Sequence, residues 1–355
     1  MNNTCLLRIV ILGLAISGTC LADTGPTIEV STVPSGFFTL NIPAGTGTAS
    51  TISALSFPLR GYSNVDGKVT GVVTGITAST ITDSNARWTP GQLSIPATPY
   101  LIEFLTGSAA GRTFLLSIST NNSATTVTLD PNDSIQTPDL TALVSVGAQY
   151  QIIPADTISS IFGTPTSTGV VGGNGNSTNA DQITILTAGW TNYYFDTSTT
   201  PGHWLRVAQP HTSGDNIVIR PDSGVYFSRF GTTPMTLTVA GQVPIVARQS
   251  LIPNGKPSSY GTSWPVDQTL SACNFQNIPG WVASSSVSTA DTFVFFSPTA
   301  GWQTYFYNGA HWILSNPSQA ISDSLVIPAG TWGYISKQGT LGTYAILKQA
   351  VPYSL

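Results

Sequence analysis

The chain has 355 residues, of which only 12 are Lys or Arg and 16 are Asp or Glu. Charged residues make up 8% of the sequence, whereas an ordinary soluble domain has roughly 25%. An isoelectric point near 5.1 and the scarcity of cations exclude the basic surface that nucleic-acid binding requires. Glu29 and Glu103 are the only glutamates. Because Glu and Lys favour helix interiors, their scarcity argues against a helical protein.

The first 22 residues have the pattern of a secretory signal peptide. Arg8 precedes an apolar run from Ile9 to Ile16, and small residues lead to Ala22, after which we expect cleavage. An uncleaved membrane anchor is one alternative, but the run is shorter than the roughly 18 residues that a spanning helix needs. A lipid anchor on Cys20 is another, although the three residues before it are all small. We expect export to the medium or the cell surface, with the periplasm also open, and no stable membrane span after cleavage.

Cys273 is the only cysteine outside this segment, since Cys5 and Cys20 lie within it. The cleaved chain would hold no internal disulfide, so packing alone must stabilise its fold. A lone cysteine can be a nucleophile or an intermolecular bridge, but free cysteines are also among the most buried residues. We expect Cys273 to be a small buried apolar side chain.

The second half of the chain contains a duplication. Residues 180–195 and 290–307 both begin Ala-Asp, continue through β-branched and aromatic residues, and reach Ala-Gly-Trp before three more aromatic residues. The segments that start at His203 and His311 then align without gaps and share eleven identities over 42 positions. The alternating apolar pattern is that of β-strands, so we interpret the two copies as tandem homologous β units.

Turn residues suggest how the strands of each copy are joined. Asn308-Gly309 is typical of a two-residue hairpin loop and would pair Tyr305 with Trp312 across two strands. The first copy has a longer polar loop, 196–202, at the same place. A second hairpin is expected in each copy, joining 216–219 to 225–228 and 324–327 to 334–336.

Residues 61–157 match neither copy but remain rich in strand-forming residues. Short apolar or alternating runs separated by turn residues predict a small barrel or sandwich inserted after the N-terminal strands. The expected elements are a hairpin of 68–76 with 80–83, a strand at 100–105, a hairpin of 112–119 with 125–129, and a strand at 150–153.

We therefore expect an all-β protein with two tandem homologous β-sandwich-like units and an inserted small β-barrel or sandwich domain. The expected parts are a signal peptide (1–22), N-terminal strands of the core unit (23–60), the inserted domain (61–157), the first repeat (158–244), a connecting strand segment (245–268) and the second repeat (269–355).

Several short motifs resemble those of a known group of proteins. The N-terminal region contributes Gly36-Phe37, Ile42–Gly45 and Phe57–Leu59, and the copies contribute Ala180–Ile183, Gly189-Trp190, the aromatic triplets 193–195 and 305–307, and Asp215/Asp323 before an apolar strand. With these motifs the chain resembles a paralogous family of exported β-rich proteins of verrucomicrobial bacteria, whose function is unassigned. The resemblance extends over nearly all of the chain after the signal segment. It implies an exported β protein and no catalytic residue.

Histidines and carboxylates offer little support for catalysis. His203 and His311 occupy equivalent positions next to a Trp in the two copies, which favours a structural role, and His211 lies in a polar loop. A glycosidase needs two facing carboxylates. The aspartates of the copies are instead duplicated at strand starts, where Asp commonly caps and turns the chain; they are Asp181/Asp291 and Asp215/Asp323.

Other motifs for chemistry are incomplete. The Gly-rich segments 107–111 and 172–176 lack the Lys and the helix of a P-loop, and no Gly-x-Ser-x-Gly elbow stands between a strand and a helix. Residues 130–133 (Asp-Pro-Asn-Asp) offer oxygen ligands for Ca²⁺ without the spacing of an EF-hand. We expect no enzyme, no cofactor and no metal site.

Aromatic residues, 10% of the chain with eight Trp, are the most promising surface for binding. Flat rings can stack on the faces of sugar rings, but cross-strand aromatic pairs also pack in cores. The candidate stacking residues are Trp190, Tyr193, Trp204, Trp302, Tyr305 and Trp312.

Taken together, the sequence favours a non-enzymatic exported protein with a structural or cell-surface role, adhesive or matrix-forming. The alternative is a carbohydrate-binding protein that uses an aromatic platform on the repeated units. The exposure of the six candidate rings distinguishes the two functions. The expected partners are polysaccharides or other cell-surface components, and the sequence leaves the oligomeric state open.

Overall fold

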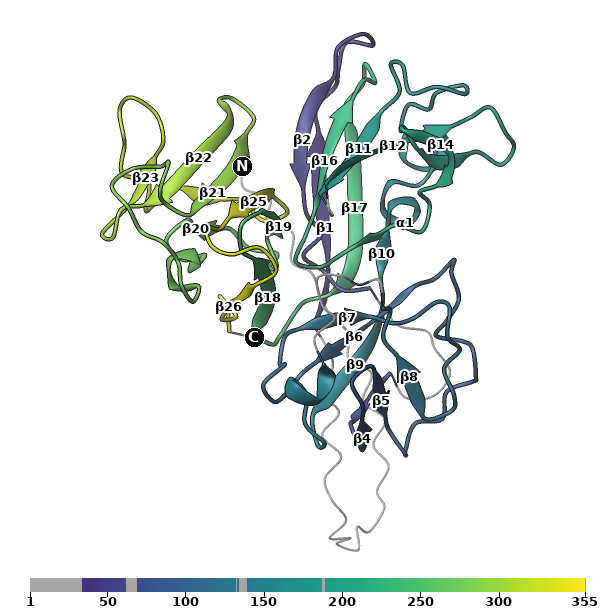
Figure 1. Ribbon diagram of the computed structural model, residues 1–355. Coiled ribbons are helices and arrows are strands. Elements are labelled where there is room, and N and C mark those ends of the chain that lie inside the picture. The colour runs from purple at the N-terminus through teal and green to yellow at the C-terminus, as the bar shows by residue number, and fades with distance from the viewer. Residues whose placement is uncertain (1–33, 62–68, 132, 134–138, 187–188, 355) are drawn as a thin grey trace, which may run out of the picture. The chain divides into compact units, whose positions relative to one another are not determined.

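Over the residues that it describes, the computed structural model is built mostly of β-strands, with two short α-helices, which confirms the predicted all-β class (Figure 1). It describes residues 34–61, 69–131, 133, 139–186 and 189–354. The expected signal peptide, residues 1–22, lies outside the described residues. Within the described ranges, neither helix has the length and apolar character needed to cross a membrane.

A first lobe is formed by strands from both sides of the inserted segment. Its main sheet has six antiparallel strands in the order β14-β13-β12-β11-β16-β2, and β1 pairs with β17 and β10 with β15. Its strands are β1 (Ser35–Ile42), β2 (Thr51–Leu55), β10 (Asp156–Thr157), β11 (Gln182–Leu186), β12 (Trp190–Asp196), β13 (His203–Arg206), β14 (Gln209–Ser213), β15 (Val218–Ile219), β16 (Val225–Arg229) and β17 (Met235–Gln242).

The two helices of the first lobe, α1 (Ile158–Phe162) and α2 (Pro165–Thr168), follow β10 directly. Each begins with a capping box in which the side chain of Thr157 or Thr164 accepts the N–H of a serine three residues later. Phe162 of α1 stacks on Phe227 with ring centroids 5.1 Å apart. Of the two helices, α1 therefore contributes side chains to the core of this lobe, whereas α2 has no buried residue.

A second lobe contains the rest of the chain from β18. Its main sheet has the order β19-β25-β21-β22-β23, and β18 pairs with β26 and β20 with β24. Its strands are β18 (Arg248–Pro253), β19 (Pro257–Gly261), β20 (Gln268–Thr269), β21 (Thr292–Ser297), β22 (Gly301–Tyr307), β23 (Trp312–Leu314), β24 (Val326–Ile327), β25 (Trp332–Ser336) and β26 (Tyr344–Gln349).

The strand pairings of the two lobes follow one order. Several strand pairs of the first lobe have a counterpart in the second. In the first lobe they are β1·β17, β2·β16, β10·β15, β11·β12, β11·β16 and β12·β13. Their counterparts, in the same order, are β18·β26, β19·β25, β20·β24, β21·β22, β21·β25 and β22·β23. Residues 245–268, expected as a connecting segment, supply β18 and β19, which pair with the last strands of the second lobe.

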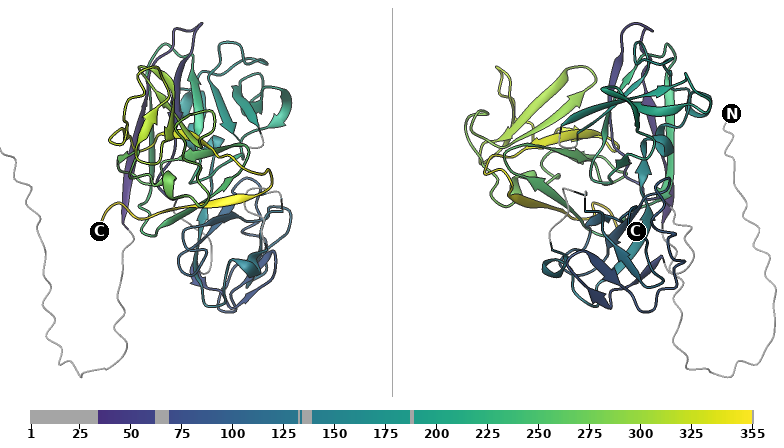
Figure 2. Two further views of the ribbon diagram at one scale, coloured as in Figure 1. Left: turned by 60° about the vertical axis from the view of Figure 1, so that its left-hand side comes forward. Right: turned by 45° about the vertical axis from the view of Figure 1, so that its right-hand side comes forward.

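The inserted lobe lies between β2 and β10 in the chain, and its blue strands stay together in every view (Figures 1 and 2). Two sheets, β3-β9-β6-β7 and β4-β5-β8, share one apolar core, and the described strands form no barrel, so the barrel alternative is wrong. Its strands are β3 (Thr70–Val72), β4 (Gly75–Ile76), β5 (Thr80–Thr82), β6 (Tyr100–Phe104), β7 (Thr113–Leu115), β8 (Thr126–Thr128) and β9 (Gln149–Pro154).

Two predicted hairpins are wrong because their strands pair with distant partners, and a third is confirmed in part. In the inserted lobe β7 pairs with β6 and β8 with β5, while the expected 112–129 hairpin is joined by the antiparallel bridge of Leu116 with Leu129 and by two backbone hydrogen bonds beside it. In the first lobe β15 pairs with β10, whereas β16 pairs with β11 and β2. The second lobe repeats this arrangement with β24 and β25.

The turn at Asn308 also differs from the predicted one. Its N–H donates to the carbonyl of His311 at 3.0 Å, and its side-chain oxygen accepts two further backbone N–H groups. Four residues therefore form the loop, and Trp312 pairs with Tyr307. The predicted pairing with Tyr305 is wrong because the side chain of Asn308 closes a longer loop than Asn-Gly alone requires.

A buried carboxylate begins the central strand of each lobe. Asp181 is fully buried and accepts hydrogen bonds from Arg229 and from three backbone N–H groups. Asp291, its counterpart, accepts two backbone N–H groups and lies 3.3 Å from the ammonium of Lys337. Each aspartate thus links the loop before its strand to the residues that follow the neighbouring strand, which is β16 in the first lobe and β25 in the second. Both aspartates therefore have a structural role.

The two lobes meet where the backbone of one approaches that of the other. The N–H of Gly261 donates to the carbonyl of Asp222 at 3.0 Å, and a Cβ at Gly261 would lie 1.9 Å from the carbonyl oxygen of Ser223. The hydroxyls of Ser56 and Thr262 bond at 2.9 Å nearby. Only glycine fits at position 261, because any side chain would push the lobes apart.

Candidate ligand-binding groove

The structure divides the six candidate aromatic residues into two groups. Four are buried: Tyr193 and Trp204 in the core of the first lobe, and Tyr305 and Trp312 in the core of the second. These four rings cannot reach a ligand at the surface, so they form no part of a platform. The side chains of Trp190 and Trp302 are 53% and 39% exposed.

Strand alternation explains this division. Trp190 and Tyr193 are three residues apart in β12, and residues an odd number apart in a strand point to opposite faces. Trp302 and Tyr305 have the same spacing in β22. The second member of each pair faces its own core, and the first faces away from it. This signal was already present in the sequence.

The two exposed tryptophans lie in one groove between the lobes. Its aromatic lining consists of Trp190, Trp302, Tyr226 and Tyr334, and it encloses about 350 Å³. Tyr226 lies in β16 and Tyr334 in β25, the strands adjacent to β11 and β21. Their identity in the two copies was visible in the sequence, but nothing there showed that their strands face each other.

A fully buried tryptophan, Trp332, supports the groove from below. Both exposed tryptophans contact its ring edge-on, Trp190 with ring centroids 5.7 Å apart and Trp302 with centroids 5.8 Å apart. Trp190 also lies nearly perpendicular to Tyr334, at 82°. Tyr226 and Trp302 are almost parallel, at 13° with centroids 6.0 Å apart. The rings therefore hold each other in place while leaving part of each tryptophan open to solvent.

Apart from the two tyrosine phenols, the polar side chains of the groove come from one lobe only. Thr184 of β11 and the exposed Asn192 of β12 line it beside Tyr226, and the three are neighbours in one cross-strand row. The corresponding row of the second lobe holds Val294, Thr304 and Tyr334. The aromatic residues thus match between the two walls, whereas the polar residues do not.

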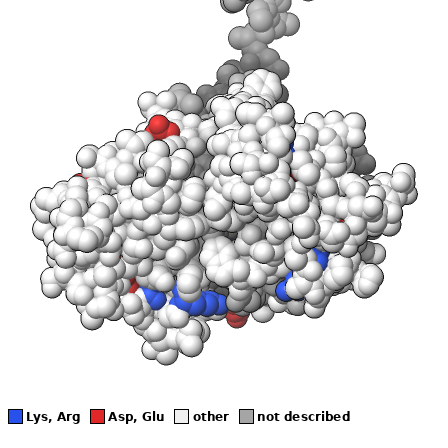
Figure 3. Space-filling view, turned by 90° about the horizontal axis from the view of Figure 1, so that it is seen from above, with Lys and Arg blue, Asp and Glu red and all other residues white. Residues whose placement is uncertain are grey.

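No charge lies within the described lining of the groove. Burial raises the pKa of the phenols of Tyr226 and Tyr334 above the ordinary value of 10, so both remain protonated at neutral pH. Each can donate or accept a hydrogen bond. The groove therefore presents apolar ring faces, two phenols, one hydroxyl and one carboxamide. On the face in Figure 3, which is seen from above, most of the described surface likewise belongs to uncharged residues.

The histidines show a duplicated structural arrangement. Nδ1 of His203 lies 3.0 Å from a carboxylate oxygen of Asp215, and Nδ1 of His311 lies 2.7 Å from Asp323. In both lobes the other carboxylate oxygen accepts the backbone N–H of the tryptophan next to the histidine, at 2.8 Å. Each aspartate thus fixes the start of a strand. His211 lines a separate hollow of about 460 Å³ with His203.

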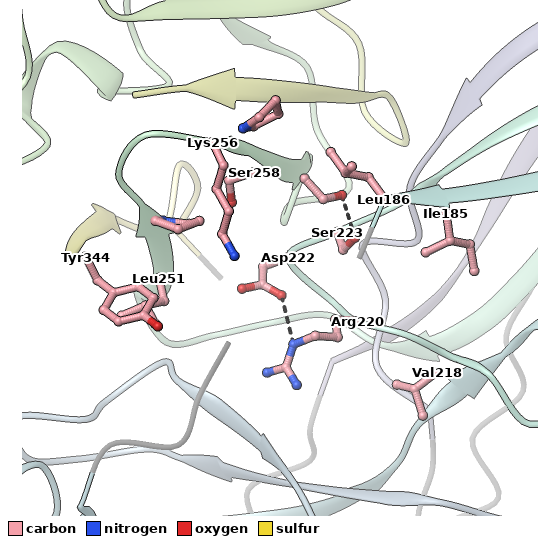
Figure 4. A pocket seen from close by; sticks show the side chains of 13 residues that line it. Ile185, Leu186, Val218, Arg220, Asp222, Ser223, Leu251, Lys256, Ser258 and Tyr344 are labelled. Atoms are coloured by element: carbon pink, nitrogen blue, oxygen red, sulfur yellow. Dashed lines mark hydrogen bonds and ion pairs between the residues drawn. The ribbon is translucent and has the colours of Figure 1, made fainter. Parts of the chain in front are cut away.

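A third hollow, drawn in Figure 4, is small and polar. It encloses about 90 Å³ and is lined by Arg220, Asp222 and Lys256, among others. The guanidinium of Arg220 donates to Asp133 at 2.9 Å and to the carbonyl of Thr113 at 2.6 Å. Because Arg220 already has these acceptors and the space holds only a few water molecules, the hollow is not a strong ligand site.

The other residues considered for metal binding or nucleophilic chemistry are ion-paired or buried. In the segment 130–133, which lacks the spacing of an EF-hand, Asp133 forms an ion pair with Arg220, and Asn132 lies outside the described residues. Among the described residues, no group of His, Cys, Asp and Glu side chains has the arrangement of a metal site. The structure confirms that Cys273 is buried, and burial raises the pKa of its thiol to about 12.

Comparison of the chain with protein-family models, with curated proteins and with solved structures found no match.

Proposed function

We propose that the protein is a non-enzymatic exported protein that binds carbohydrate in the groove between its two main lobes. The observation that carries this proposal is that two partly exposed tryptophans and two tyrosines line one groove. Exposed aromatic side chains gathered in one place mark binding surfaces. Apolar hollows with a few polar groups are the usual form of small-ligand sites.

The chemistry of the lining fits a sugar. The C–H faces of a pyranose ring are apolar and pack on the faces of Trp190 and Trp302, while its hydroxyls bond to phenol, hydroxyl and carboxamide groups. The described lining contains no charged residue, so a neutral ligand leaves no charge without a partner. The signal-like segment 1–22 and the resemblance to exported proteins support a location where polysaccharides are met.

The test is retention of the purified protein on a panel of polysaccharides, both insoluble and in affinity gels. We expect at least one polysaccharide to be bound, and the single variants Trp190→Ala and Trp302→Ala to bind it about tenfold more weakly. An aromatic contact contributes about 0.5–1.5 kcal/mol beyond its buried area, and a factor of ten corresponds to about 1.4 kcal/mol.

Phe37→Ala is the matched control, because Phe37 is 80% exposed on β1 and does not line the groove. It should leave binding unchanged. If no polysaccharide is retained, the carbohydrate proposal is wrong and the structural or adhesive role favoured by the sequence becomes the better one. If Phe37→Ala weakens binding as much as the tryptophan variants do, the site is not this groove.

A further inference from the structure

We infer that the groove holds a single neutral glycan chain, and that Asn192 sets how the chain is oriented in it. This inference rests on the proposed function and makes it more specific. It concerns three properties of the ligand: the shape of the surface it presents, its charge, and the direction in which it lies.

The angles between the rings decide the shape of the ligand. A protein that binds the flat face of a crystalline polymer needs several rings in one plane. Here the plane of Trp190 is 82° from that of Tyr334, and the plane of Trp302 is 52° from it. Tyr226 and Trp302 are parallel to within 13°, but the other rings are inclined to them, so the four rings line a trough and do not share one plane. A separate chain can enter such a trough, but the surface of a solid polymer cannot.

The absence of charge in the described lining decides the charge of the ligand. An acidic glycan needs a Lys or Arg near its carboxylate or sulfate, and none lines the groove. A quaternary ammonium group also binds to aromatic rings, but it gains most where a carboxylate completes the cage, and no carboxylate is present among the lining residues. A neutral sugar leaves no buried charge without a partner.

The unequal walls decide the orientation. The carboxamide of Asn192 is exposed, and within the described residues it makes no side-chain hydrogen bond, so both of its polar groups are available to a ligand. Its cross-strand neighbour Thr184 adds a hydroxyl on the same wall. The equivalent positions in the second lobe, Val294 and Thr304, do not line the groove. Hydroxyls on one edge of the sugar chain therefore find a carboxamide and a hydroxyl beside a phenol, whereas those on the opposite edge find only the phenol of Tyr334.

The experiment compares four probes by affinity electrophoresis and sedimentation. They are a soluble neutral glucan or xylan, crystalline cellulose or chitin, an acidic polymer such as alginate, and choline as a competitor. We expect the soluble neutral polymer to bind, with no competition from choline. Asn192→Ala should weaken this binding severalfold, whereas Thr304→Ala, the matched variant on the other wall, should leave it unchanged. Near-ultraviolet circular dichroism and thermal melting establish that each variant is folded.

Retention on the crystalline polymer alone, or tighter binding of the acidic polymer, overturns this inference while the carbohydrate proposal stands. Displacement by choline overturns the assignment of a neutral ligand. Equal binding by Asn192→Ala and the unaltered protein overturns the role of Asn192. Failure of every polysaccharide to bind overturns the inference together with the proposed function.

Discussion

Replacing Asp181 with asparagine tests the account of how the first lobe is held together. One carboxylate oxygen accepts the N–H groups of Phe230 and Gly231, at 2.6 and 3.2 Å. The other accepts the N–H of Val171 at 2.8 Å and a bond from Arg229. Every partner is a donor, so the NH₂ group of an asparagine would face donors whichever way its amide is turned. Asp181→Asn therefore loses hydrogen bonds as well as charge.

The expected cost follows from the burial of both partners. Asp181 is fully buried and Arg229 is 2% exposed, and removing one partner of such a pair typically costs about 3–5 kcal/mol because the other charge stays buried. Arg229 keeps only the carbonyls of Gly169 and Thr233 as acceptors, at 2.8 and 3.1 Å. We expect Asp181→Asn to lower the free energy of unfolding by about 3–5 kcal/mol.

Urea unfolding followed by tryptophan fluorescence measures this loss. Asp139→Asn is the control, because Asp139 is an exposed helix cap and asparagine caps a helix about as well as aspartate. The double variant Asp181→Asn with Arg229→Met should recover part of the stability by removing the stranded cation. A loss below about 1 kcal/mol for the single variant, the size of an ordinary cap, would refute the reasoning.

Three further experiments test other parts of the structure. Burial raises the pKa of Asp156 to about 6 against the attraction of Arg60. The folded protein then holds a proton between about pH 6 and 4 that the unfolded chain releases, so stability should rise as pH falls through this window. Asp156→Asn should remove that rise in thermal melts, and an unchanged slope would contradict the assignment. Cys273 should react with a thiol reagent only after unfolding, whereas rapid reaction of the native protein would contradict its burial. Gly261→Ala should weaken both stability and glycan binding, because the added Cβ meets a backbone oxygen of the facing lobe at 1.9 Å; unaltered binding would show that the groove tolerates displaced lobes.

Local patterns in the sequence were sufficient for the class of fold and for several strands. The apolar run at 100–105 and the run at 150–153 became β6 and β9, because a strand with both faces covered needs apolar residues at successive positions. The pairing of strands was less predictable. In the first lobe β16 and β17 pair with β2 and β1, which precede the inserted lobe, and in the second lobe β18 pairs with the distant β26. No local signal in the sequence specifies such distant partners.

The groove could be predicted only in part. Alternation separates Trp190 from Tyr193 and therefore identifies which rings share a face. It does not say which face becomes a core. That depends on how two sheets from different parts of the chain meet, and the glycine at 261 that permits their approach is not distinguished by its sequence context from other strand glycines.

The position of the groove has a thermodynamic consequence. One wall belongs to the first lobe and the other to the second, so a ligand that touches both walls binds only while the lobes are together. Such a ligand must oppose their separation, by about 2.7 kcal/mol when its concentration is a hundred times its dissociation constant. Ligand binding and the association of the two lobes are then one coupled equilibrium, and the protein would be hardest to pull apart where its ligand is most abundant.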